Sequence, residues 1–428
     1  MRRTVWRKVF GVCLLILALI LTACGGGGGG TGGSGGGSTG GTGSSGGTGG
    51  SGGDQGGQGT GSATPIRIGL VFSITGNSSS LGEPERNTAE LFKGDWTEIN
   101  GHPIEWIIED DQSDPTQAVV TVQRLIEEDQ VAAVVCCTIS PSSMAILDVV
   151  QQAGVPNISV AASAAIVEPV NERYWVFKTP QNDALMIDIM TDYMVAQGHR
   201  RIAFIGFNDA YGDGGRVELE RLAPGKGLEI VAVESFARDD TDTTAQVTRM
   251  AAQNPDAFLV WAIPPGANVA HRNIYDLQLP QPIYQSHGVA NRQFIELGGD
   301  SVEGTLMPAG KLLVADQLPD DDPQKELLLA YRDRYEARYG QGTANTFGGH
   351  AWDAMAILAH VIENVLNAGG DPADLPAFRA AIRDELERVQ EFVGISGIFN
   401  YSAGDHHGLD HRAGTMITIQ NGNWQILP

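Results

Sequence analysis

The sequence has few cysteines, few aromatic residues and few basic residues for its length. Its 428 residues include 4 Cys, 7% aromatic residues, and 28 Lys and Arg against 51 Asp and Glu, which gives a formal net charge of −23 at pH 7. So few cysteines exclude a small domain held together by disulfides. The negative charge argues against binding to nucleic acid or to an anionic membrane surface, because both repel a negatively charged protein.

Long hydrophobic runs are also missing, and the longest clear one lies at the start of the chain. Four basic residues precede the apolar run 9–21, which is shorter than the roughly 20 residues that span a membrane. The run ends in Leu21-Thr22-Ala23-Cys24, which resembles the lipobox of bacterial lipoproteins. We therefore expect residues 1–23 to be a signal peptide and Cys24 to carry the lipid that anchors the protein to the cell membrane, in the periplasm or on the outer surface.

Glycine is abundant, but it is concentrated in one segment. Of 56 glycines, 24 lie between residues 25 and 61, among Ser, Thr, Gln and one Asp. This composition predicts a flexible linker over residues 24–64, with a root-mean-square span of about 30–37 Å. The remaining part of about 365 residues is enough for two domains.

Cys136 and Cys137 are adjacent in the apolar run 131–137. They could form a redox-active pair or be two buried thiols in a strand. We favour buried thiols, because a disulfide between neighbouring residues has unfavourable geometry.

Short β-branched runs alternate with amphipathic segments over more than 200 residues, which predicts an α/β fold with parallel sheets covered on both faces. Strands are predicted at residues 66–72, 104–109, 131–136, 156–159, 201–207, 230–233, 257–261, 282–285, 398–401 and 415–419. Helices are predicted at residues 88–98, 116–127, 142–153, 185–197, 244–252, 267–277, 324–339 and 348–366.

Ligands of such sheets bind beyond the carboxyl ends of the strands. Polar or small residues follow five of the predicted strands, at residues 73–76, 138–140, 161–163, 208–212 and 286–288.

Enzyme motifs are missing from the part of the chain that is expected to fold. There is no nucleophile elbow, phosphate-binding loop or dinucleotide-binding fingerprint, so we expect no catalysis and no cofactor. The segment Asp405–His411 (DHHGLDH) could hold a metal ion or could be a solvated turn between late strands. We favour the turn and predict no metal site.

Five segments, in this order and spacing, resemble the branched-chain amino-acid type of periplasmic binding protein. They are residues 66–76 (IRIGLVFSITG), 110–118 (DDQSDPTQA), 153–159 (AGVPNIS), 208–212 (NDAYG) and 397–400 (GIFN). The resemblance implies two Rossmann-like lobes joined by three crossovers that close over a small ligand by hinge bending. It places residues 65–182 and 308–413 in one lobe and residues 183–307 and 414–428 in the other.

The resemblance also implies a binding site. Ser140 and Ser163 match the hydroxyl residues that hold the ligand carboxylate in amino-acid-binding members, with backbone groups of Ala161 and Ala162 beside them. Tyr211 matches the aromatic residue of the second lobe, and Leu81 matches a bulky side chain that packs on the ligand. Without the resemblance, the two serines could simply cap helices.

Two positions depart from the family pattern. His287 stands where members that bind α-amino acids place a carboxylate for the ammonium group, and an imidazole cannot supply that negative charge. Either another acidic residue binds the ammonium, or the ligand is a carboxylate without an α-amine. A disulfide of the family is also missing, because Ser113 and Ile139 occupy the matching positions.

From the resemblance we expect a monomeric solute-binding protein of an ABC importer. It would capture a small carboxylate, deliver it to the permease, and contact the membrane only through its N-terminal lipid. The alternatives are a ligand-sensing module that works with a separate signalling receptor, and an extracellular hydrolase, against which the missing nucleophile elbow counts.

Overall fold

The computed structural model describes residues 63–427. The predicted signal peptide, the lipidated Cys24 and nearly all of the predicted linker lie outside the described residues. Within residues 63–427, no helix is both long and apolar enough to cross a membrane.

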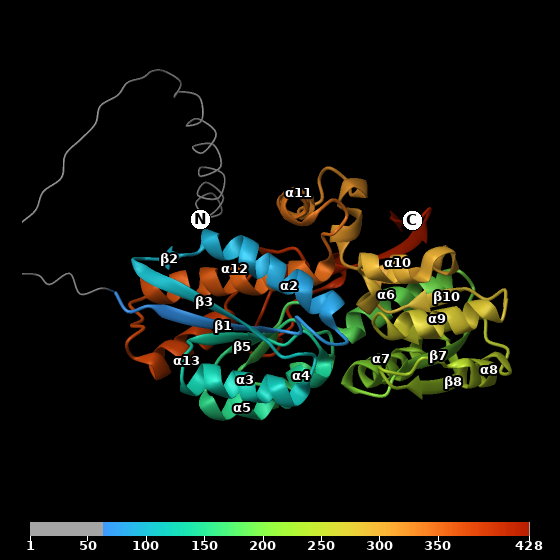
Figure 1. Ribbon diagram of the computed structural model, residues 1–428, viewed down its shortest axis with the longest axis horizontal. Helices are drawn as coiled ribbons and strands as arrows, with labels where there is room; N and C mark the ends of the chain where they lie inside the picture. The colour runs from blue at the N-terminus through green and yellow to red at the C-terminus, as the bar shows by residue number, and fades with distance from the viewer. Residues whose placement is uncertain (1–62, 428) are drawn as a thin grey trace, which may run out of the picture. The chain divides into compact units, whose positions relative to one another are not determined.

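The first sheet has six strands in the order β2-β3-β1-β4-β5-β6, and all of them are parallel except β2. Helices cover both faces: α2 and α12 on one, and α3, α4 and α5 on the other (Figure 1). We call this sheet and its helices lobe 1. The strands are β1 (Ile66–Phe72), β2 (Glu98–Ile99), β3 (His102–Asp110), β4 (Ala133–Cys136), β5 (Asn157–Ser159) and β6 (Val176–Lys178). The helices are α2 (Ser79–Phe92), α3 (Pro115–Glu127), α4 (Ser140–Ala145), α5 (Leu147–Ala153), α12 (Thr346–Asn367) and α13 (Leu375–Leu386).

The second sheet has seven strands in the order β15-β14-β11-β10-β9-β7-β8. The strands from β11 to β8 are parallel, whereas β14 and β15 are antiparallel to their neighbours. We call this sheet and its helices lobe 2. The strands are β7 (Arg201–Phe207), β8 (Glu229–Phe236), β9 (Ala257–Trp261), β10 (Ile283–Gln285), β11 (Leu306–Ala309), β14 (Thr415–Gln420) and β15 (Asn423–Ile426). The helices are α6 (Asp183–Ala196), α7 (Ala210–Leu222), α8 (Thr244–Ala251), α9 (Gly266–Asp276) and α10 (Arg292–Gly298).

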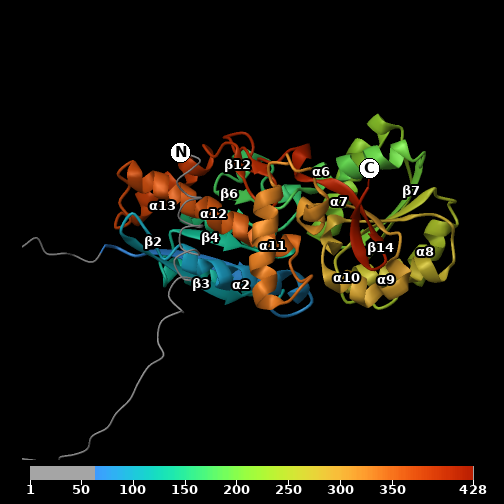
Figure 2. The ribbon, with the colours of Figure 1, turned by 90° about the horizontal axis from the view of Figure 1, so that it is seen from above.

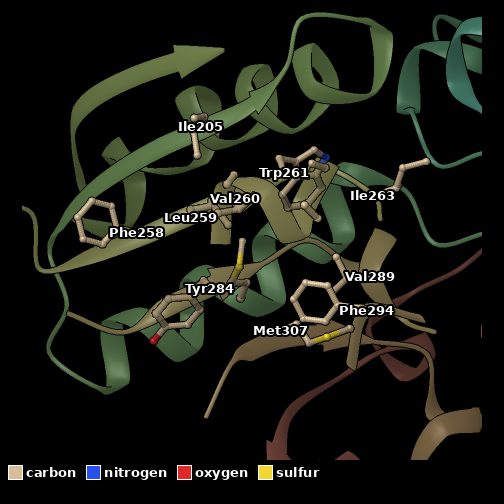
Figure 3. Close-up of a cluster of buried hydrophobic side chains, with 14 of the residues drawn as sticks. Ile205, Phe258, Leu259, Val260, Trp261, Ile263, Tyr284, Val289, Phe294 and Met307 are labelled. Carbon is tan, nitrogen blue, oxygen red and sulfur yellow. The ribbon is translucent and has the colours of Figure 1, made fainter. Parts of the chain in front are cut away.

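Apolar side chains from several strands fill the interior of lobe 2. Phe258 and Val260 of β9 lie near Tyr284 of β10 and Met307 of β11, and Phe294 packs beside them (Figure 3). Their burial follows from the apolar character of the parallel strands, which are covered on both faces.

The chain passes between the two sheets three times. It leaves the first sheet after β6 and enters the second at β7; it leaves again after β11 and returns with β14. Between these last two strands lie α11 (Lys325–Tyr339), α12, α13 and the hairpin of β12 (Phe392–Val393) and β13 (Ile398–Phe399). Figure 2 shows α11 near the junction of the lobes. The predicted α/β class with two lobes is confirmed. The second sheet continues to Ala309, two residues beyond the predicted boundary at 307.

The expectation for Cys136 and Cys137 was wrong. A disulfide joins the two residues at the end of β4, and both are fully buried. The peptide bond between them is cis, and their Cα atoms lie 3.0 Å apart.

The segment Asp405–His411 is not the solvated turn that we expected, because two of its histidines are buried. His406 contacts the carbonyl oxygen of Val176 through Nδ1 at 2.9 Å and stacks on Phe177. His407 accepts a hydrogen bond at Nε2 from the backbone N–H of Asn182 at 3.1 Å. These hydrogen bonds join the segment to β6 and to the first crossover. Within residues 63–427, no group of three or more His, Cys, Asp or Glu side chains is placed to hold a metal ion.

Candidate ligand-binding site

A small cavity lies where the carboxyl ends of strands from the two sheets meet, which is the expected position for a ligand site in folds of this type. Lobe 1 and the first crossover contribute Leu81, Thr138, Ile139, Ser140, Val160, Ala161, Ala162, Pro180, Phe347 and His350. Lobe 2 contributes Tyr211, Arg238, Ile263, His287 and Gly288. No Asp or Glu is among these lining residues. The cavity volume is about 30 Å³, and one water needs about 10–15 Å³, so a larger ligand requires the lobes to move apart.

The structure brings six of the seven predicted site residues to this cavity: Leu81, Ser140, Ala161, Ala162, Tyr211 and His287. The seventh, Ser163, is not among the lining residues; instead its backbone N–H donates to Ser140 Oγ at 3.2 Å. That these residues bind a ligand stays a prediction. A larger open hollow at the edge of lobe 2, between α7 and β8, contains none of them.

Hydrogen bonds on the lobe 1 wall leave Ser140 as a donor. Its Oγ accepts the N–H of Ser163, so the hydroxyl proton is available to an acceptor in the cavity. Ala161 donates its N–H to Ser159 Oγ at 3.1 Å. Thr138 Oγ1 accepts the N–H of Ser73 at 2.8 Å and donates to the buried carboxyl of Glu85. Thr138 is thus occupied within lobe 1, whereas the Ser140 hydroxyl can serve a ligand.

Two buried charged residues lie behind this wall. Lys178, the last residue of β6, donates from Nζ to the carbonyl oxygen of Ala162, and Asp183 begins α6. Both are 0% exposed. Burial lowers the pKa of Lys178 and raises the pKa of Asp183, because each charged form loses its hydration. In its charged form, Lys178 also lowers the pKa of His287, a cavity residue, by like-charge repulsion.

Tyr211 belongs to the lobe 2 wall, but its hydroxyl is used inside that lobe. Asp209 caps α7, with its Oδ1 accepting the N–H of Tyr211 at 2.8 Å. Tyr211 Oη donates to Ser286 Oγ at 2.9 Å, and Ser286 Oγ donates to the carbonyl oxygen of Ala262 at 2.9 Å. A Cβ at Gly288 would lie 2.5 Å from Tyr211 Oη, so this position has room only for glycine. Tyr211 therefore offers its ring to the cavity.

His287 has an unusual environment for a polar side chain. It is 6% exposed, and neither ring nitrogen has a hydrogen-bond partner in the described part of the chain. Its ring meets those of Tyr211 and Trp261 edge to face. Burial, aided by the charge of Lys178, lowers the pKa of His287 to about 3. The imidazole is therefore neutral at physiological pH, with one nitrogen as a donor and the other as an acceptor.

The sequence interpretation missed two polar residues of the cavity. Arg238 comes two residues after β8, but the predicted strand ended at Val233, five residues before Arg238. His350 lies on α12, far from any predicted strand end, and no local signal marks it. Its Nδ1 contacts Ser396 Oγ at 2.7 Å, and burial holds the pKa of His350 well below its usual value.

The family model described as periplasmic binding protein matches residues 65–422. The chain belongs to this family. Among curated relatives, a leucine-, isoleucine-, valine-, threonine- and alanine-binding protein of Pseudomonas aeruginosa is 22% identical over 306 residues, covering 71% of this chain and 79% of the relative. The Leu/Ile/Val-binding protein of Escherichia coli is 23% identical over 324 residues, covering 74% of this chain and 84% of the relative.

Solved structures of the same fold include an extracellular ligand-binding receptor from Rhodopseudomonas palustris. It is 33% identical, covers 85% of this chain and 100% of its own, and has a TM-score of 0.80. A solute-binding protein of R. palustris in complex with benzoate is 20% identical, covers 85% of this chain and 95% of its own, and has a TM-score of 0.70.

These matches confirm the resemblance to the branched-chain amino-acid-binding proteins. Members of this extracytoplasmic family bind solutes and are not enzymes, so the hydrolase alternative is wrong.

Proposed function

We propose that this protein captures a small carboxylate between its two lobes and delivers it to the permease of an ABC importer. The observation that carries the proposal is the cavity itself: residues of both lobes surround it, including six that the family pattern assigns to ligand binding. Because the chain crosses between the sheets three times, the lobes can separate by bending at the crossovers and close again over a ligand.

A carboxylate suits the polar groups of the cavity. The Ser140 hydroxyl proton is available to an acceptor, and Arg238 supplies a permanent positive charge on the opposite wall. Charge-assisted hydrogen bonds of this kind are about twice as strong as neutral ones. A micromolar Kd requires about −8 kcal/mol, which a buried carboxylate and an apolar pocket can supply.

The ligand lacks an α-ammonium group in this proposal. No Asp or Glu lines the cavity among the described residues, and His287 is neutral and cannot replace one. A buried ammonium without a negative partner would cost several kcal/mol. Curated relatives are named for amino acids and one solved relative contains benzoate, so acids with and without an ammonium fit this fold. The cavity of this chain favours an acid without an ammonium group.

The N-terminal segment supports the delivery step. A lipid on Cys24 would anchor the protein, and the glycine-rich linker would let the lobes sample solute while staying within reach of a permease. We place the protein outside the cytoplasm on this basis, and the family resemblance leads us to propose that it acts as a monomer.

A thermal-shift screen tests the proposal. Leucine, 4-methyl-2-oxopentanoate, leucinamide and benzoate are each added at millimolar concentration. A ligand with micromolar affinity stabilises the folded state by about 4 kcal/mol. We expect stabilisation by an acid without an amine and little by leucine or leucinamide. If no carboxylate shifts the melting temperature, the site assignment is wrong. A strong shift from leucine that survives the His287→Ala substitution would show that another group binds the ammonium.

A further inference from the structure

The lobe 2 wall of the cavity contains two polar side chains that have buried hydrogen-bonding atoms without a partner. Nη1 of Arg238 has no partner among the described residues, and the same holds for both ring nitrogens of His287. Leaving such atoms unpaired in a buried position is costly, and most buried polar groups in proteins are paired. Both residues line the cavity, so a ligand is the partner that can reach them.

Two contacts hold the Arg238 guanidinium group in place and leave its Nη1 atom free. Its Nε donates to Asp209 Oδ2 at 2.6 Å, and its guanidinium group lies 4.6 Å from the centre of the Phe207 ring. Asp209 is itself fixed, because its other oxygen caps α7. The ion pair and the ring thus hold one side of the guanidinium, and Nη1 remains as a preorganised donor.

The lobe 1 wall, which faces Arg238 and His287 across the cavity, can bind one carboxylate. Ser140, with the small residues beside it, presents its donor from lobe 1, whereas Arg238 and His287 present theirs from lobe 2. A ligand with a single carboxylate would satisfy one wall and leave the other unpaired. We infer that the ligand is an organic acid with a second oxygen acceptor (a carboxylate, carbonyl or hydroxyl group) at the end remote from its first carboxylate, and that Arg238 and His287 bind this second group. The inference rests on the proposed function and refines it.

The Arg238–Asp209 pair decides what the second group can be. Asp209 already neutralises part of the guanidinium charge, so a neutral oxygen is sufficient and a second carboxylate is also acceptable. An ammonium group or a purely apolar group at this end of the ligand would leave Nη1 without an acceptor. Sites that hydrogen-bond a substrate group discriminate strongly against analogues that lack it.

Calorimetric titration of the full-length protein with matched compounds tests the inference. Butanoate, 4-hydroxybutanoate and succinate form one series, and benzoate and 4-hydroxybenzoate form another. We expect at least one compound with the second oxygen to bind ten or more times more tightly than its matched monocarboxylate. The hydroxyl and carboxylate members of the first series distinguish a neutral acceptor from a charged one.

Variants assign the preference to residues. In Arg238→Met, the preference for the compound with the second oxygen over its matched monocarboxylate is expected to fall to less than threefold, while the monocarboxylate still binds. His287→Phe leaves the Arg238–Asp209 pair intact and should also reduce this preference. It provides the test if Arg238→Met does not fold. Arg216→Met is the matched control, because Arg216 lies on α7 outside this cavity and pairs with Asp213 and Glu220.

The outcomes separate this inference from the proposed function. Equal affinity for the matched compounds in the wild-type protein overturns the inference and leaves the proposed function standing. A preference that survives both substitutions overturns the roles of Arg238 and His287. If no carboxylate of either series binds, both the inference and the proposed function are wrong.

Discussion

Replacing His287 with Phe should make the stability of the protein less sensitive to acid. The pKa of His287 falls from 6.5 to about 3 on folding because the ring is buried. Between pH 6.5 and pH 3, the His287 ring is protonated in the unfolded chain but not in the folded protein. Protonation therefore favours the unfolded chain, and the free energy of unfolding falls as the pH drops from 6.5 toward 3. Above pH 6.5 there is no such loss. At pH 5 the loss is about 2 kcal/mol relative to pH 8, from 1.36 kcal/mol per pH unit.

Urea unfolding of the ligand-free protein at pH 8 and pH 5 measures this loss. The Phe ring fits a similar space between Tyr211 and Trp261 and does not titrate. The difference in unfolding free energy between the variant and the wild type should therefore grow by about 2 kcal/mol from pH 8 to pH 5. Other titrating groups are common to both proteins and cancel. Ile263→Val, which changes the same cavity without a titrating group, is the control. A difference that is the same at both pH values would show that His287 is hydrated or paired and would refute the reasoning.

Three further substitutions test the walls of the cavity. Ser140→Ala should weaken binding of the best acid by about tenfold or more in calorimetry, because a hydrogen bond to a charged group contributes about 1.5–3 kcal/mol. Ser142 is a buried serine of the same helix outside the cavity, so Ser142→Ala should leave the affinity unchanged. Gly288→Val should lower the unfolding free energy by about 2 kcal/mol or more, because its Cβ would lie 2.5 Å from Tyr211 Oη; an unchanged Tm would contradict this contact. Thr138→Val should cost about 1–3 kcal/mol in urea unfolding by leaving a buried amide and carboxyl unpaired, and a smaller loss would mean that water replaces the hydroxyl.

The strands were the part of the fold that the sequence predicted best. β1, β7 and β9 have the predicted bounds, because each is a largely apolar run of five to seven residues with a change of composition at both ends. β6 and β11 were missed because β6 ends in Lys178 and β11 contains Pro308, and neither residue type is typical of a buried strand.

α7 was missed for a different reason. It contains Gly212, Gly214 and Gly215, and each glycine costs about 1 kcal/mol in a helix. Packing requires two of these glycines: a Cβ at Gly212 would collide with the backbone of Phe207, and one at Gly215 would collide with the ring of Trp261. Tertiary packing here overrides helix propensity, which no local pattern shows.

The site could be predicted where it follows strand ends and not elsewhere. Ser140, Ala161 and His287 come directly after β4, β5 and β10, so the rule for parallel sheets located them. Arg238 obeys the same rule but was hidden by a strand predicted three residues too short. His350 reaches the cavity from α12, a helix of lobe 1 that is distant in sequence from the lobe 1 strands, and only the folded chain brings it there.

A crystal structure with the acid that gives the largest thermal shift is the most direct test of the account. We predict a carboxylate between the lobes within hydrogen-bonding distance of Ser140 Oγ, a second oxygen near Arg238 Nη1, and no Asp or Glu in contact with the ligand. A ligand bound outside this cavity, or one whose ammonium group pairs with a carboxylate of this chain, would contradict the account.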